Sequence, residues 1–263
     1  MKKYILIVIT AILALSVASC QKTSEGVTEI VNFFQLNGAR TMFLGIGDDF
    51  TDPGYVEMEH GGTVETKIIN MFGEEVEAVT TEDPGYFNIY YHTTNDQGVD
   101  LDMVRTVYIY DATVEETLSR GKIIPEECVF FVQNEETGEY EPYGTYAEYA
   151  PFYASKGYDT TTDVTLAIKQ VAGNIYTIDD AIGGWYAYIR GYGPAYDWAY
   201  EFGFSGYFTL NADMTLSALS DFYSPAWGEA TESFQGFYDP EAKKLTIIST
   251  WSGMAWMVVV DQK

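Results

Sequence analysis

Short alternating runs, separated by glycine, proline, asparagine and aspartate, dominate this chain and restrict it to a β-rich fold. Residues 64–68, 87–91 and 105–111 each place apolar side chains at every second position, which is the period of a half-buried strand. Tyrosine and glycine are abundant, with 22 and 24 copies, and helix-type periodicity is scarce. Both features favour strands and tight turns. The sequence therefore predicts an all-β protein.

About seven short strands are expected between residues 28 and 111, the size and rhythm of an immunoglobulin-like β-sandwich. Four segments also resemble the bacterial Ig-like repeats of surface proteins. Residues 50–54 resemble their aromatic-any-Asp-Pro-Gly turn, and residues 85–91 resemble their Gly-any-Tyr-any-Val-any-Tyr strand. Residues 95–98 take the place of their Asp-x-x-Gly hairpin, and residues 105–109 match their closing Arg-Thr-Val-any-Val strand. The resemblance implies an N-terminal Ig-like domain over residues 28–111.

Residues 112–127 form the expected linker, in which Thr113 and Glu116 fit a capping box and predict one helical turn. A second antiparallel β domain, a sandwich or a flattened barrel, is expected over residues 128–263. It contains a hairpin that turns at residues 172–173. Further strands are predicted at residues 128–133, 185–190, 202–210, 215–219, 234–238, 244–250 and 254–260.

The second domain resembles the C-terminal β domain of lipoproteins from Gram-negative gut anaerobes, on residues 174–186 and 190–193. The shared signature is Asp-any-any-Gly-Gly-aromatic-Tyr, which corresponds here to residues 180–186. In that family a lipobox and an Ig-like domain precede a β domain of unknown function. Its genes often lie among components that capture and import glycans. The resemblance therefore implies a location and a neighbourhood, and it implies no reaction.

The first 20 residues indicate where the protein is located. Two lysines precede an apolar run over residues 5–15, which is shorter than the roughly 20 residues that cross a bilayer. Small residues then lead to Cys20, as in the lipobox of bacterial lipoproteins, although an ordinary signal peptide with a chance cysteine is the alternative. We expect residues 1–19 to be a lipoprotein signal peptide, Cys20 to be lipidated and residues 20–27 to be a tether. The expected location is the outer membrane, on its periplasmic face or at the cell surface.

The composition narrows the range of partners. The formal net charge is −25, from 39 acidic and 14 basic residues. Such a chain is repelled by nucleic acid and by anionic headgroups, because the neutralisation of phosphate needs lysine and arginine. Membrane attachment is therefore expected to depend on acyl chains. With Cys20 acylated, Cys128 is the only other thiol, so no intramolecular disulfide is expected and a buried position is predicted for Cys128.

A glycine- and aromatic-rich stretch, residues 183–198, is the predicted ligand site. Flat rings cover the apolar C–H faces of sugars at a low cost in conformational entropy. The alternative is that these rings fill the β core. A second tyrosine-rich run, residues 140–158, is either a lid packed over the sheet or another platform for a glycan. The candidate glycan-binding residues of the first stretch are Trp185, Tyr186, Tyr188, Tyr192, Tyr196 and Trp198.

No cofactor and no metal ion are expected. The sequence has no Gly-x-Ser-x-Gly elbow, P-loop or dinucleotide fingerprint. The acidic residues between positions 48 and 57 do not have the spacing of an EF-hand loop. His60 and His92 are isolated from any zinc-binding pattern.

The sequence favours a non-enzymatic envelope lipoprotein, with the Ig-like domain as a spacer and the second domain as a binding module of a polysaccharide-uptake system. The expected partners are the membrane, through the lipid, and either a glycan or outer-membrane importer proteins. One alternative is a purely structural or assembly lipoprotein at the cell surface. Another is a glycoside hydrolase, which would need two carboxylates about 5 to 10 Å apart in a cleft.

Overall fold

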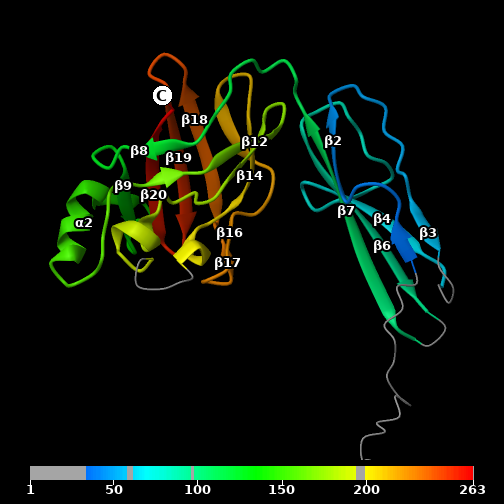
Figure 1. Ribbon diagram of the computed structural model, residues 1–263, viewed down its shortest axis with the longest axis horizontal. Helices are drawn as coiled ribbons and strands as arrows, with labels where there is room; N and C mark the ends of the chain where they lie inside the picture. Colours follow the sequence, from blue (N-terminus) through cyan, green and yellow to red (C-terminus); the bar gives the residue numbers. More distant parts are fainter. Residues whose placement is uncertain (1–33, 58–61, 96–97, 194–198, 263) are drawn as a thin grey trace, which may run out of the picture.

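The computed structural model describes residues 34–57, 62–95, 98–193 and 199–262, and it contains two β-rich domains (Figure 1). The expected signal peptide, Cys20 and the tether lie outside these residues, as do Tyr196 and Trp198. In the part of the chain that the structure describes, no helix is long and apolar enough to cross a bilayer. The prediction of an all-β protein with two domains is confirmed.

The N-terminal domain consists of two sheets. One has five strands in the order β2-β7-β6-β4-β5, and the other pairs β1 with β3. The pair β2 and β7 is parallel, whereas the other pairs are antiparallel. The strands are β1 (Phe34–Leu36), β2 (Thr41–Gly45), β3 (Tyr55–Glu57), β4 (Glu65–Asn70), β5 (Glu75–Val76), β6 (Gly85–Thr94) and β7 (Asp100–Tyr110).

The core of this domain lies between its two sheets. Phe34 and Leu36 of β1 pack in one cluster with Ile89 of β6 and with Val107 and Ile109 of β7. Phe34 and Leu36 are two positions apart on β1, as are Val107 and Ile109 on β7. The two residues of each strand therefore point to the same face. The alternation in the sequence therefore determines which side chains form this core.

A buried ion pair connects the Asp-Pro-Gly turn to β7. Arg105 is fully buried, and its guanidinium donates to the carboxylate of Asp52 and to three backbone carbonyl oxygens. The hydroxyl of Tyr91 donates to the other oxygen of Asp52 over 2.6 Å. A buried guanidinium needs such partners, because burying an unpaired charge is very unfavourable. These contacts account for Asp52 without a metal ion.

The C-terminal domain is built on an eleven-stranded sheet whose strand pairs are antiparallel. Its main path runs β10-β9-β20-β19-β18-β15-β14-β13-β12, and β8 pairs with both β20 and β11. A separate pair joins β16 (Tyr223–Ser224) to β17 (Glu229–Ala230). The strands of the large sheet are β8 (Gly121–Ile123), β9 (Val129–Gln133), β10 (Tyr140–Thr145), β11 (Thr165–Leu166), β12 (Ile168–Ala172), β13 (Ile175–Ile178), β14 (Gly206–Leu210), β15 (Thr215–Ala218), β18 (Ser233–Asp239), β19 (Lys244–Trp251) and β20 (Met254–Asp261).

The structure differs from the sequence-based expectation in the linker. Strand β8 lies within residues 112–127, so part of the expected linker belongs to the large sheet. The expected helical turn at Thr113 is absent from the structure. The carboxylate of Asp111 accepts both the N–H and the hydroxyl of Thr113, over 2.8 and 2.7 Å. The Thr113 hydroxyl is therefore used as a donor to Asp111.

Helical segments cover parts of the second domain. They are α2 (Tyr146–Ala154), the π-helix η1 (Trp185–Ile189) and the 3₁₀ segment η2 (Ala199–Phe202). The prediction of a strand at residues 185–190 is wrong. Gly183 and Gly184 have φ angles of 63° and 77°, in the left-handed region that favours glycine, and the chain turns there into a helix.

Aromatic side chains fill the contact between the two domains. The ring of Tyr108 on β7 stacks on Phe43 of its own domain, with centroids 5.4 Å apart, and on Tyr207 of the C-terminal domain at 5.0 Å. Ile175 and Leu219 are buried in the same cluster. The contact therefore forms a small core of its own, which we call the joint.

A buried asparagine adds directed hydrogen bonds to the joint. The side-chain oxygen of Asn174 accepts the N–H of Asp111 over 2.7 Å. Its amide nitrogen donates to Thr209 Oγ1 over 2.7 Å and to the Leu210 carbonyl over 3.0 Å. Because these partners belong to both sides of the joint, they fix the direction in which the chain enters the C-terminal domain.

Candidate functional site

The structure separates the predicted glycan-binding residues into two groups. Trp185 and Tyr186 are buried, with 1% and 3% of their surface exposed. Tyr188 is 41% exposed, and Tyr192 is partly exposed. Two rings of the predicted site therefore lie in the core, and two reach the surface.

Trp185 is buried because its motif builds a turn. The carboxylate of Asp180 accepts the N–H groups of Ile182, Gly184 and Phe204 at 2.7 to 3.1 Å. The indole of Trp185 then stacks on Phe130 with centroids 4.5 Å apart. The glycan contact expected for Trp185 and Tyr186 is corrected here, because their rings fill the β core, as in the alternative interpretation of the sequence.

Exposed and partly exposed rings gather instead around helix α2. Ring centroids follow one another at about 6 Å, from Tyr143 to Tyr149, Tyr153, Tyr158 and Tyr192. Phe152, which is 51% exposed, contacts both Tyr149 and Tyr153. We call this set the aromatic face: Tyr143, Tyr149, Phe152, Tyr153, Tyr158 and Tyr192.

Helix α2 begins with a capping box that fixes its first turn. The Thr145 hydroxyl accepts the N–H of Glu148 over 3.3 Å, and the Glu148 carboxylate accepts the N–H of Thr145 over 2.8 Å. Tyr146 is completely buried, and its hydroxyl donates to the carbonyl of Ile182 over 2.6 Å. The buried side of α2 is thus tied to the turn before η1. Tyr149 and Tyr153, three and seven residues after Tyr146, lie half-buried along the same side of the helix, and Phe152 is exposed.

A β-bulge presents Tyr143 to solvent. In the β9–β10 ladder Pro142 pairs with Phe131 and Gly144 pairs with Phe130, so Tyr143 is the extra residue. Its side chain is 69% exposed. A Cβ on Gly144 would lie 3.0 Å from the ring of Tyr149, so a glycine allows that ring to approach the strand.

The aromatic face contains a groove of about 580 Å³. Its volume lies in the range of small-molecule sites. Backbone and side-chain hydrogen bonds from Thr145 lower the pKa of Glu148, so this carboxylate remains an ionised acceptor at neutral pH. Aromatic walls with one charged acceptor suit a ligand that has apolar faces and hydroxyl edges. The groove is lined by Phe130, Tyr143, Gly144, Glu148, Tyr149, Phe152 and Tyr153.

Arg190 connects the aromatic face to the core beneath it. Its guanidinium lies 5.3 Å from the ring centroids of Tyr153 and Tyr186 and 4.9 Å from that of Tyr192. Such cation–π contacts are strongest where water is excluded. Tyr153 belongs to α2 and Tyr186 to η1, so the arginine holds these helices together.

The groove lacks the parts of a hydrolytic or metal site. Among the residues that line it, Glu148 is the only carboxylate, whereas a glycosidase needs two. No group of three or more histidine, cysteine or acidic side chains in the described ranges could hold a metal ion.

Helix α2 was not predicted from the sequence as a carrier of exposed rings. Residues 183–198 carry the most conspicuous motif, but the two rings of its signature are needed for the core. The signal for the aromatic face is the Thr145-x-x-Glu148 capping box, which makes residues 146–154 a helix and places their rings on its two sides.

Comparisons with known proteins divide the chain in the same way. Residues 34–109 match the family model of a bacterial surface protein Ig-like domain. Residues 132–262 match the family model of a C-terminal domain. Neither description names a catalytic activity.

A lipoprotein of Bacteroides thetaiotaomicron, known from its crystal structure, is similar to this chain. The sequence identity is 23%, the match covers 87% of this chain and 98% of the other, and the TM-score is 0.41. A search of curated proteins finds no match.

Proposed function

Since the chain joins a bacterial surface Ig-like domain to a second β domain, we propose that it is a lipid-anchored envelope protein that binds a glycan. The anchor is the acylated Cys20, in the outer membrane. The Ig-like domain is the spacer, and the aromatic face of the C-terminal domain is the binding surface. The protein performs no reaction on the glycan.

The aromatic face is the observation that carries the glycan proposal. Five rings, four of them from the aromatic face, line a groove that also holds an ionised carboxylate. Sugar rings stack on such surfaces through their C–H faces, and their hydroxyls donate to the carboxylate. Helix α2 lies on the side of its domain that faces away from the Ig-like domain (Figure 1), so a long polysaccharide reaches it without obstruction from the spacer.

The glycan proposal is tested by affinity electrophoresis and calorimetry with the mature chain and a panel of neutral plant and host polysaccharides. Tyr143→Ala and Phe152→Ala remove exposed rings, and each should weaken binding by about 1–2 kcal/mol. Phe237→Ala is the matched control, because Phe237 is 50% exposed on β18. If no polysaccharide binds, or if the control weakens binding as much as the two variants do, the proposal fails.

The anchor is tested independently of the ligand. Cys20→Ser removes the thiol that the lipobox places at the start of the mature chain, and the variant should leave the membrane fraction. Binding of glycan by the purified soluble chain should not change. An altered protein that still sediments with outer-membrane vesicles would refute lipid anchoring.

A second function, assembly with another envelope protein, is favoured by a separate observation. Phe72 on the Ig-like domain is 77% exposed, the highest value among the exposed large hydrophobic side chains of the described residues. If the glycan panel fails and the protein is recovered in complex with an importer, assembly becomes the main function.

A further inference from the structure

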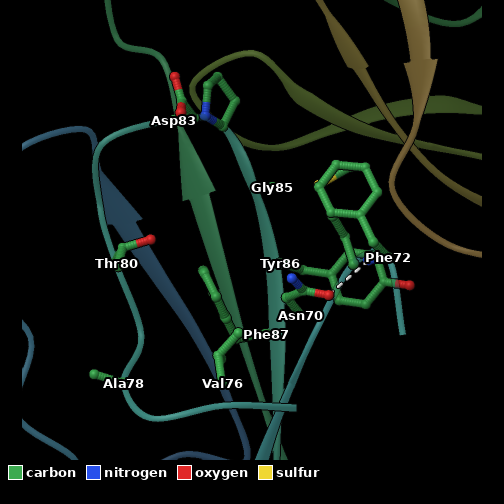
Figure 2. Close-up of a pocket in the computed structure, with 11 residues that line it drawn as sticks. Asn70, Phe72, Val76, Ala78, Thr80, Asp83, Gly85, Tyr86 and Phe87 are labelled. Atoms are coloured by element: carbon green, nitrogen blue, oxygen red, sulfur yellow. Dashed lines mark hydrogen bonds between the residues drawn. The ribbon is translucent and has the colours of Figure 1, made fainter. Parts of the chain in front are cut away.

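An apolar hollow lies on the Ig-like domain, beside the joint (Figure 2). We propose that it receives one apolar side chain of a partner protein, from a segment in which lysine or arginine flanks that side chain. The hollow is on a different domain from the aromatic face, so the proposal stands independently of glycan binding.

The hollow has a volume of about 420 Å³, which lies in the range of ligand pockets. The rings of Phe72 and Tyr86 lie on one side of it, and Ala78 and Thr80 lie on the other (Figure 2). Met71 and Tyr86 also pack into the joint, so one wall is supported by the contact between the domains. A hollow with this support is suited to an inserted side chain.

A rigid turn holds Phe72 at the rim. The Asn70 side-chain oxygen accepts the N–H groups of Phe72 and Glu74, each over 3.0 Å, and its amide donates to the Glu74 carboxylate over 3.1 Å. Gly73 has φ of 79°, which closes the turn. The backbone of Phe72 is thus held in place before any partner arrives, so little backbone entropy is lost when the ring is covered.

The surroundings of the hollow determine the charge of the partner. Asp83 lines the hollow, and the same segment of the chain carries four further exposed carboxylates, Glu74, Glu75, Glu77 and Glu82. The sequence has no lysine or arginine between residues 68 and 104. Complementary charge on a partner accelerates encounter and excludes acidic competitors. An anionic membrane surface is repelled for the same reason.

The test uses the mature chain labelled with ¹⁵N-phenylalanine and three peptides, Gly-Lys-Phe-Lys-Gly, Gly-Glu-Phe-Glu-Gly and Gly-Lys-Ala-Lys-Gly. The first should shift the N–H signals of Phe72 and Phe87 and bind about tenfold tighter than the other two. Phe72→Ser and Asp83→Asn should each weaken the first peptide, the former by about tenfold. Phe237→Ser is the control for removal of an exposed ring, and it should leave binding unchanged.

Three results would overturn the proposal. Equal binding of the glutamate-flanked peptide would remove the charge argument. Shifts confined to phenylalanines of the C-terminal domain would place the peptide elsewhere. A dimer in sedimentation that dissociates in the Phe72→Ser variant would show that the occupant is a second copy of this chain.

Discussion

Replacing Asp180 with asparagine should make the stability of the C-terminal domain less dependent on pH. Asp180 is 8% exposed, and burial raises the pKa of its carboxyl from 3.8 to about 7. The three N–H groups that donate to it offset only part of this effect. The folded state therefore holds the proton up to about pH 7, whereas the unfolded chain releases it at a lower pH. As a result, the wild-type domain loses stability as the pH rises through this interval.

The magnitude follows from the difference between the two pKa values. About three pH units, at about 1.4 kcal/mol each, correspond to roughly 4 kcal/mol at full deprotonation. Asparagine carries no charge at any pH, so it escapes this loss. Its amide nitrogen would face the N–H of Gly184, which Asp180 accepts at 2.7 Å, and two opposed donors add a constant cost of about 1–3 kcal/mol. As the pH rises, the free energy of unfolding of the wild type should therefore fall relative to that of Asp180→Asn.

Tryptophan fluorescence in urea measures this domain selectively, because all five tryptophans lie between residues 185 and 256. Glu241→Gln is the control, since it removes one negative charge from an exposed position of the same domain. The unfolding free energies of the three proteins are compared from about pH 4 to about pH 8. A difference between wild type and Asp180→Asn that stays constant over this range would refute the reasoning.

Asp52→Asn should destabilise the Ig-like domain by about 3–5 kcal/mol, because a buried guanidinium loses its charged partner. Circular dichroism should show earlier unfolding of this domain, and the unfolding transition of the tryptophans should not shift. Gly173→Ala should loosen the joint, since φ is 49° and an added Cβ would lie 2.1 Å from the ring of Tyr110. Small-angle scattering should give a larger radius of gyration for this variant, and an unchanged scattering profile would contradict the prediction. In the unanchored soluble chain, Cys128 should react with a thiol reagent only on unfolding, because it is buried and burial raises its pKa to about 12; rapid reaction in native buffer would show that the site opens.

The strands of both domains follow from local sequence because each strand lies between a core and solvent. The runs predicted at residues 244–250 and 254–260 become β19 and β20, which pair over eight residues. The hairpin predicted at residues 172–173 joins β12 to β13. In these segments the alternation of side chains and the turn residues both predict the same strands and hairpins, so no distant contact is needed to specify them.

The aromatic face depends on contacts that local patterns do not encode. Tyr143 is exposed because its strand gains one residue relative to β9, and that register is set by the pairing of two strands. Thr113 and Thr145 each begin a capping-box pattern in the sequence, and of these two only Thr145 begins a helix. At Thr113 the hydroxyl and the N–H instead donate to Asp111. The choice between them depends on a neighbouring side chain.

The signature at residues 180–186, which suggested a ligand site in the sequence, contributes to the core. Gly183 and Gly184 reverse the chain, and a Cβ at either position would lie less than 3.0 Å from a side chain of Val258 or Val164. The turn drives Trp185 inward onto Phe130. Because Phe130 also lines the groove, the signature supports the aromatic face from below. Trp185 therefore positions the floor of the groove through its contact with Phe130.

The joint decides how the two proposed sites relate to each other. Separating the domains would expose Tyr108, Ile175 and Leu219 to water. It would also leave the side-chain oxygen of Asn174 without the N–H of Asp111. Burial and directed hydrogen bonds therefore favour the arrangement in which the domains are in contact. The hollow shares residues with this joint, whereas helix α2, which carries three rings of the aromatic face, lies on the side of the C-terminal domain away from the Ig-like domain (Figure 1). If both proposals hold, a partner protein in the hollow would leave the aromatic face open, and the joint would keep the two ligands at a fixed separation.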